Sequence, residues 1–265
     1  METESSLAKL VGLSNALLTN SGNSAIFAAL HLCRLAGKTK VLIPHEGSWF
    51  SYKHLPGLLG MEIEEIHTDY ALLNLEDLRA KLDNKAVVLF ATLGAYAVLE
   101  PIEQIIQLSH KAGALVIGDI SGTIGMSGVN HCLLDFAVAS FGHNKPLEVG
   151  YGGMIASNGS LSTPVLLMAK FPEFLIEKLQ AAMDSLQSRY EFLFRKRQKF
   201  LPKLNLLGEL AHPGLVGINL LIKHKPKEVI EFCKANNLPF LLCPRYHRVR
   251  EKAISIELKR LRKKA

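Results

Sequence analysis

The stretch that decides the fold is DFAVASFGHNKPLEVGYGG, residues 135–153. Its first six residues form a short apolar run of the kind found in buried strands, and the run ends at Ser140. Lys145 follows five residues later, and a glycine-rich turn comes next, at residues 150–153. Taken by itself, Lys145 is more typical of a solvated loop lysine. Whether it has a functional role depends on the residues that the rest of the chain places around it.

The chain before this stretch alternates between short apolar runs and helix-like segments. The runs are rich in β-branched residues and bounded by Gly, Pro, Asp or Asn, which predicts buried strands at residues 40–43, 62–66, 86–90 and 114–117. Apolar residues at three- and four-residue spacing predict helices at residues 24–36, 75–82 and 101–112. This alternation predicts an α/β fold, in which a mostly parallel sheet is sandwiched by helices.

The order of elements changes in the last third of the chain. A long amphipathic helix is expected at residues 173–200, broken by Pro202. A strand, a helix and two more strands are expected after it, at residues 215–222, 226–236, 239–242 and 253–258. We therefore expect a large domain at residues 1–170, a linking helix at 171–202 and a small α+β domain of β-α-β-β order at 203–265.

Composition and charge exclude other classes of protein. The chain has 265 residues, of which 48% are hydrophobic and 21% charged, and this is too apolar for a disordered protein. The net charge is +7, but residues 1–194 carry 13 Lys/Arg against 19 Asp/Glu, whereas residues 195–265 carry 18 against 5. The basic run at residues 259–264 lacks interleaved aromatic residues, which favours a solvated basic face over a nucleic-acid partner.

Targeting signals and cysteine spacing indicate the compartment. The longest uncharged apolar stretch, residues 86–99, is shorter than the roughly 20 residues of a membrane-spanning helix, and the first residues do not follow the pattern of a signal peptide. Cys33, Cys132, Cys233 and Cys243 form no C-x-x-C pair, which favours buried thiols over disulfides or a metal site. We expect a cytoplasmic enzyme with no metal and no membrane partner.

Three further segments place chemically useful groups at strand ends or at the start of a helix, where ligands of open α/β sheets bind. Ser21-Gly22-Asn23-Ser24 opens a predicted helix and can offer N–H groups to a phosphate, although such a turn is more often an ordinary N-cap. Asp119 follows the run at residues 114–117 and either caps the next turn or pairs with a cation. Trp49, the only tryptophan, follows the run at residues 40–43.

In their order along the chain, these parts resemble the fold type I enzymes that use pyridoxal 5'-phosphate (PLP), and most closely the DegT/DnrJ family of sugar aminotransferases. The family's SGTAAL is matched by SGNSAI at residues 21–26, and its EDAA by GDIS at residues 118–121. Its SFxxxKxxxxGxGG is intact at residues 140–153, and its LQAA recurs at residues 179–182. The likeness covers most of the chain, and the lysine motif is its most specific part.

The resemblance implies a PLP site with assigned roles. Lys145 would form a Schiff base with the cofactor and then act as the base that moves a proton, and partial burial is expected to favour its neutral form. Asp119 would pair with the pyridine nitrogen, and Trp49 would stack on the ring. The phosphate would be bound by Gly22, Asn23, Ser24 and Ser140. The resemblance further implies a homodimer that acts on a small-molecule amino donor and an amino acceptor such as a sugar or sugar nucleotide.

The sequence departs from the family where substrate or a partner subunit would be contacted. Gly122 stands where the family usually has Gln or His. Glu173 stands where the family has the Asn that reaches the partner subunit's phosphate, and relatives are usually longer before residue 21 and after the glycine-rich turn. No arginine matches the one that commonly binds an α-carboxylate; Arg245 and Arg248 are candidates, or else they form a solvated surface pair.

Two alternatives stay open. Another PLP reaction, a lyase or a sulfur transfer, would use the same cofactor residues, although no cysteine stands on an evident mobile loop. A non-catalytic regulatory protein with the PLP fold is favoured by the departures and disfavoured by the intact Lys145 and Asp119.

Overall fold

A seven-stranded sheet organises the computed structural model, which describes residues 2–262. Its strands are β1 (Asn15–Thr19), β2 (Lys40–Pro44), β3 (Glu62–Ile66), β6 (Ala86–Ala91), β9 (Leu115–Asp119), β10 (Phe136–Ser140) and β11 (Gly153–Ser157). They lie in the order β1-β11-β10-β9-β6-β2-β3. Strand β11 runs antiparallel to both of its neighbours, and the other pairs are parallel. The expected mostly parallel sheet is therefore confirmed.

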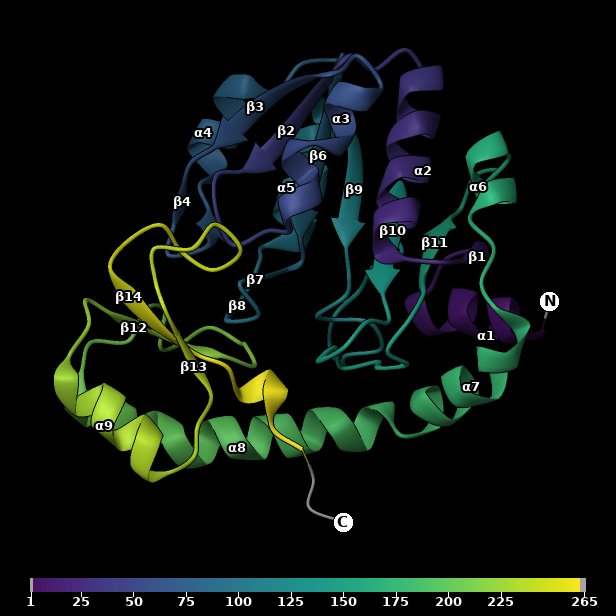
Figure 1. Ribbon diagram of the computed structural model, residues 1–265. Helices are drawn as coiled ribbons and strands as arrows, with labels where there is room; N and C mark the ends of the chain where they lie inside the picture. Colours follow the sequence, from purple (N-terminus) through teal and green to yellow (C-terminus); the bar gives the residue numbers. More distant parts are fainter. Residues whose placement is uncertain (1, 263–265) are drawn as a thin grey trace.

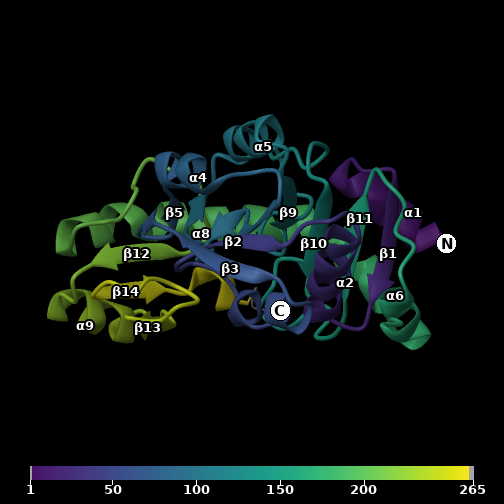
Figure 2. The same cartoon turned by 90° about the horizontal axis from the view of Figure 1, so that it is seen from above.

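Helices cover both faces of this sheet, as expected (Figures 1 and 2). One face is covered mainly by α2 (Gly22–Leu35), α3 (Leu55–Leu58) and α6 (Pro164–Met168). The other face is covered by α1 (Glu2–Val11), α4 (Leu75–Lys81), α5 (Ile102–Lys111), α7 (Ile176–Asp184) and α8 (Leu186–Leu207). Among residues 2–262, no helix combines the length and the apolar character that crossing a membrane requires.

Alternation of side chains along the strands explains the two layers. In β2, Val41 and Ile43 point to the core shared with α2, whereas Leu42 points to the core shared with α5. All three are completely buried. Each such side chain contributes about 1.5–3 kcal/mol by leaving water, so continuous apolar runs are stable only between two covered faces. This is why runs of β-branched residues in the sequence identified the parallel strands.

The elements missed by sequence reasoning are those with weak local patterns. Strand β11 begins with a glycine and follows a glycine-rich turn, and its neighbour β1 is the edge strand NALLT. Short ribbons and a 3-10 helix were also missed, namely β4 (Thr68–Asp69) with β5 (Leu72–Leu73), β7 (Leu93–Gly94) with β8 (Val98–Leu99), and η1 (Phe50–Lys53). Strands β1 and β11 are held by pairing with distant backbone, and the ribbons and the 3-10 helix are too short to show a periodic pattern.

The long helix after the large sheet differs from expectation at its C-terminal end and near its middle. Pro202 does not break it; α8 continues through Pro202 to Leu207, and the interruption lies at Ser185, between α7 and α8. A proline inside a helix costs about 3 kcal/mol. Buried side chains on both sides of Pro202, Phe200 and Leu204, pack into a second hydrophobic core and offset that cost.

A small antiparallel sheet lies at the far end of α8 (Figure 1). It consists of β12 (Leu220–Lys223), β13 (Phe240–Leu242) and β14 (Ala253–Ile256), in the order β12-β14-β13, and is covered by α9 (Lys227–Ala235). The first of these strands begins at Leu220 rather than at residue 215, because Val216 and Ile218 instead hydrogen-bond the backbone of Leu99 and Tyr96. The basic run continues beyond Leu261 and Arg262, and its Lys263 and Lys264 lie outside the described residues.

Glu100, which directly follows β8, carries a buried carboxyl group. Only 4% of Glu100 is exposed, and its Oε2 accepts one hydrogen bond, from the Leu73 N–H at 3.1 Å. Burial raises the pKa of the Glu100 carboxyl from 4.5 to about 8. Glu100 is therefore protonated in the folded protein at neutral pH and ionised in the unfolded chain.

We predict that Glu100 by itself contributes a loss of stability on the order of 1 kcal/mol per pH unit as the pH rises from about 5 to 8, measured as the difference between wild type and a variant without this carboxyl. Glu100→Gln keeps a neutral acceptor for Leu73 and should flatten this decline. Urea unfolding at pH 5, 6.5 and 8 measures it, with Glu62→Gln, an exposed glutamate, as the control. An equally steep decline in wild type and Glu100→Gln would contradict the prediction.

Candidate functional site

A cavity of about 410 Å³ opens at the carboxyl ends of the parallel strands. This is within the range of roughly 300–1,000 Å³ that is typical of ligand pockets, and strand ends are where open α/β sheets bind ligands. The cavity is lined by six of the seven residues that the sequence singled out, namely Gly22, Asn23, Trp49, Asp119, Ser140 and Lys145. Residues far apart in the sequence thus meet in one place.

The start of α2 forms one end of the cavity. Ser21 caps the helix, and its Oγ accepts a hydrogen bond from the Ser24 N–H at 3.1 Å. Ser24 does not line the cavity; its hydroxyl is 2.5 Å from Asn20 Oδ1 and supports the turn. A Cβ at Gly22 would lie 2.7 Å from Ser140 Cβ, so only glycine allows the helix to begin this close to β10. The first-turn N–H groups and the Ser140 hydroxyl fit a phosphate.

Trp49 forms an aromatic wall beside this helix start. Its Nε1 donates a hydrogen bond to Asn23 Oδ1 at 3.0 Å, which fixes the indole against the turn. The side chain is 45% exposed, and its ring centroid is 5.6 Å from Lys145 Nζ. A flat ligand can therefore stack on the indole close to the lysine.

Asp119, at the end of β9, is held by two donors. Its Oδ1 accepts from the Ser121 N–H and its Oδ2 from the Tyr52 hydroxyl, both at 2.9 Å. Tyr52 is completely buried, and burial together with the Asp119 charge holds the pKa of its hydroxyl well above the usual value. Tyr52 therefore remains a hydrogen-bond donor. Asp119 caps the next turn, as one interpretation of the sequence had it, and its carboxylate also lines the cavity.

Lys145 lies beside a tyrosine that sequence reasoning missed. Its Nζ donates a hydrogen bond to the Tyr96 hydroxyl at 2.8 Å. Burial lowers the pKa of Lys145, but the nearby Tyr96 and Asp119 outweigh burial and hold the pKa above its usual value. Burial thus acts in the expected direction, but the protonated amine is favoured overall, because the Tyr96 hydroxyl and the Asp119 carboxylate face it.

Tyr96 also explains the glycine that departs from the family pattern. A Cβ at Gly122 would lie 2.9 Å from Leu93 Cβ and 3.3 Å from Tyr96 Cε1. The space next to Gly122 is thus filled by the loop that carries Tyr96. Tyr96 has a positive φ of 61° at the tight turn between β7 and β8, and the turn sequence Gly94-Ala95-Tyr96 just after β6 was the one available signal.

The small sheet contributes one wall of the cavity, which is lined by the basic residues His247, Arg248, Lys259 and Arg260. Arg248 is not part of a solvated surface pair with Arg245: it is 5% exposed, whereas Arg245 is exposed. Its Nε and Nη2 each lie 2.6 Å from an oxygen of the fully buried Glu257. Burial raises the pKa of Glu257, but Arg248 and Lys259 outweigh burial and hold it below the usual value. Long-range packing creates this wall, so local pattern did not reveal it.

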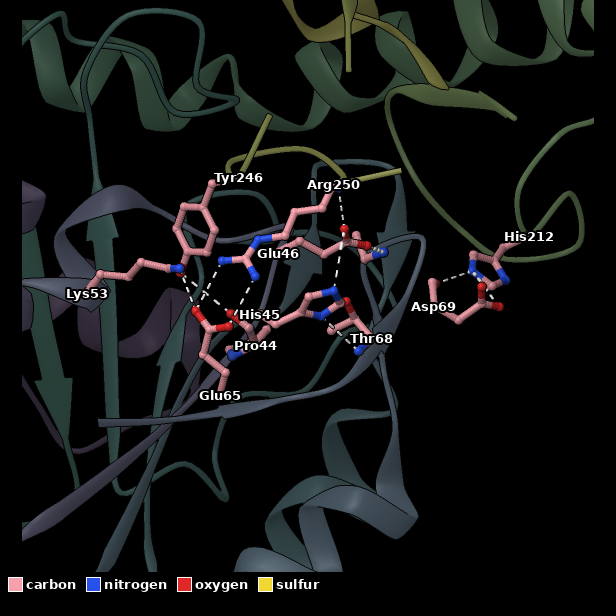
Figure 3. A network of polar contacts seen from close by, with 11 residues as sticks. Pro44, His45, Glu46, Lys53, Glu65, Thr68, Asp69, His212, Tyr246 and Arg250 are labelled. Atoms are coloured by element: carbon pink, nitrogen blue, oxygen red, sulfur yellow. Dashed lines mark hydrogen bonds and ion pairs between the residues drawn. The ribbon is translucent and has the colours of Figure 1, made fainter. Parts of the chain in front are cut away.

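A polar network anchors the loop that carries His247 and Arg248 to the large sheet (Figure 3). The Arg250 guanidinium makes two hydrogen bonds of 3.1 Å to the Glu65 carboxylate, which Lys53 also contacts. The Arg250 N–H donates to the buried Glu46, and the Gly47 N–H donates to the Tyr246 carbonyl at 2.9 Å. These contacts fix the position of the loop at the cavity.

Glu173, another departure from the family pattern, lies away from this cavity. It is in the 3-10 helix η2 (Glu173–Leu175), where it is exposed and borders a second hollow between α1, β1 and α6. Within one chain, Glu173 is therefore not placed to repel a ligand bound at α2.

Solved structures share this fold. They include 3-amino-5-hydroxybenzoic acid (AHBA) synthase, with TM-score 0.75, 16% identity and coverage of 97% of this chain and 84% of that one. DesV of S. venezuelae has TM-score 0.75, 15% identity and coverage of 97% and 82%. Serine palmitoyltransferase of S. paucimobilis has TM-score 0.71, 18% identity and coverage of 97% and 70%. These likenesses establish the PLP-transferase fold of type I.

Sequence comparison gives the family. No curated protein matches this sequence. The model of the DegT/DnrJ/EryC1/StrS aminotransferase family matches residues 1–170, which is more than half of the chain. The chain therefore belongs to the DegT/DnrJ/EryC1/StrS aminotransferase family.

Proposed function

We propose that this protein is a PLP-dependent aminotransferase in which Lys145 holds the cofactor covalently and the amino group passes to a sugar or sugar nucleotide. The observation that carries the proposal is that Lys145, Asp119, Trp49 and the start of α2 meet in one cavity. Similar folds support it: one of these structures is a putative sugar aminotransferase of Streptococcus pneumoniae in a PLP form, with 11% identity and TM-score 0.71.

The donor set of the cavity fits PLP. The phosphate would lie against the N–H groups of Gly22 and Asn23 and the Ser140 hydroxyl, and the ring would lie on Trp49. Residues 1–194 carry more Asp and Glu than Lys and Arg, so these local donors, rather than net charge, would hold the phosphate. When bound, PLP draws electrons from the carbon that bears the amino group.

Asp119 would control the protonation of Lys145. The Asp119 charge is one cause of the raised pKa of Lys145. Pairing Asp119 with a protonated pyridine nitrogen would cancel that charge and release Lys145 toward the neutral amine that a base requires. Tyr96, which accepts a hydrogen bond from Lys145 Nζ, would then orient the amine.

Amino transfer fits better than sulfur transfer. Cys33, Cys233 and Cys243 are buried, Cys132 is partly buried, and none of these four cysteines lines the cavity. A sulfur-transfer enzyme needs a thiolate that reaches the substrate.

A homodimer is part of the proposal. The surface at α6 and η2 exposes three large apolar side chains, Leu167, Met168 and Phe174, to 74%, 79% and 84%. Leu167 borders the second hollow, and exposed apolar groups of this kind mark an association surface. A second copy of the chain that covers this surface would remove them from water.

For the cofactor, we predict that the purified protein absorbs at the wavelength of a PLP–lysine Schiff base and that borohydride fixes PLP to Lys145. Lys145→Ala should lose the absorption and the adduct, because no amine remains at that place. Lys203→Ala, which changes an exposed lysine on α8, should keep both. Adding glutamate to wild type should convert the spectrum to that of pyridoxamine phosphate. An unchanged spectrum and adduct in Lys145→Ala would refute the proposal.

For the dimer, we predict that sedimentation equilibrium gives about twice the mass of one chain. Phe174→Glu should weaken association by about tenfold or more, since it would bury a charge in an apolar contact. Leu206→Glu changes another apolar side chain, 88% exposed on α8, and should leave association unchanged. A monomeric wild type, or equal association in the two variants, would contradict the prediction.

A further inference from the structure

Lys259 is a second lysine in the cavity, which the proposed role of Lys145 does not use. It lies in the 3-10 helix η3 (Leu258–Arg260), directly after β14. Only 7% of it is exposed, and its Nζ is 4.0 Å from the centroid of the Tyr96 ring. Its backbone is fixed at both ends, because its N–H donates to Asn219 and its carbonyl accepts from Arg189 at 2.7 Å. The side-chain amine is therefore held at the cavity.

The other cations of the wall already have partners, and Lys259 does not have an equivalent one. Arg248 uses Nε and Nη2 on Glu257 and donates its Nη1 to the His247 carbonyl. Arg260 Nε is 3.5 Å from the same carboxylate, and Lys145 donates to Tyr96. Among residues 2–262, no ion pair forms at Lys259 Nζ. A buried amine that packs against an aromatic ring and has no ion-pair partner gains most from an anion that enters the cavity.

We propose that Lys259 binds the α-carboxylate of the amino donor and is thus a specificity-determining residue of this site, an inference that rests on the proposed aminotransferase function. Lys145 Nζ and Lys259 Nζ lie 5.2 Å and 4.0 Å from the same Tyr96 ring centroid. The α-carboxylate is attached to the carbon that bears the reacting amine, so its binding group must stand beside Lys145. The phosphates of a sugar nucleotide lie several bonds farther from the reacting carbon, so a group beside Lys145 suits the α-carboxylate better than those phosphates.

The surroundings of Lys259 give this binding a measurable signature. Burial and the charges of Arg248, Lys145 and Arg260 hold the pKa of Lys259 well below its usual value, and Glu257 opposes them only in part. Tyr96 is the other polar group that faces it. A bound carboxylate would favour the charged form, so binding should be accompanied by proton uptake.

Titration calorimetry of the PLP-loaded protein with glutarate tests the inference. Glutarate carries two carboxylates and no amine, so it binds without reacting. We expect proton uptake, seen as a heat that depends on the ionisation enthalpy of the buffer. Lys259→Met should weaken glutarate binding by about tenfold or more and abolish the uptake. Lys259→Arg should bind glutarate without uptake, since arginine is always charged. Lys252→Met, at an exposed lysine, should behave as wild type.

The outcomes separate this inference from the proposed function. Schiff-base absorption in Lys259→Met together with unchanged glutarate affinity overturns the role of Lys259 and leaves the cofactor site intact. Absence of that absorption in wild type overturns the proposed function itself. If Lys259→Met does not fold, Lys259→Arg decides, because proton uptake equal to wild type would refute the inference. If Lys259→Met bound a nucleoside diphosphate more weakly than wild type but bound glutarate equally well, the inference would also be refuted, and Lys259 would instead contact the amino acceptor.

Discussion

The ion pair between Arg248 and Glu257 organises the side of the cavity that the small sheet provides. Glu257 is fully buried and binds Arg248 through both oxygens, and its Oε1 also accepts from Ser255 Oγ at 2.7 Å and from Asn219 Nδ2 at 3.3 Å. Removing one partner of such a pair typically costs about 3–5 kcal/mol, because the other charge stays buried. Asn219 in turn donates to the Ala95 carbonyl, next to Tyr96. The small sheet and the large sheet are thus tied together next to Tyr96, the residue that Lys145 and Lys259 both approach.

The parts of the fold that were predictable are those whose signal is local. Val41, Leu42 and Ile43 form a strand because each is buried on one face or the other, and β-branched runs of this kind identified the parallel strands within a few residues. Pro202 shows where prediction from local sequence fails. Its local preference to break a helix is outweighed by Phe200 and Leu204, whose packing depends on residues far along the chain.

The candidate site divides in the same way. Gly22, Asp119 and Lys145 lie at strand ends or at a helix start, and the motif spacing predicted them as site residues; all three line the cavity. Tyr96, Arg248 and Lys259 carry no motif: Tyr96 is placed by the turn between β7 and β8, and Arg248 and Lys259 reach the cavity because the last residues fold back onto the large sheet. Burial lowers the pKa of Lys145 as expected, but Tyr96 and Asp119 act on the amine through space and outweigh burial. The role of each residue in chemistry stays a prediction.

The edge of the large sheet at β3 has a consequence for solubility. An exposed edge strand offers unpaired backbone groups to other chains and so invites edge-to-edge aggregation. The sequence of β3 is EIEEI, and Glu62 and Glu64 place carboxylates on this edge strand, whereas Glu65 is paired with Arg250 and Lys53. Two copies that approached through β3 would bring these carboxylates together and repel each other. The edge therefore protects the monomeric folding chain from open-ended sheet growth and leaves the opposite side of the molecule, at β1 and α6, for ordered contact.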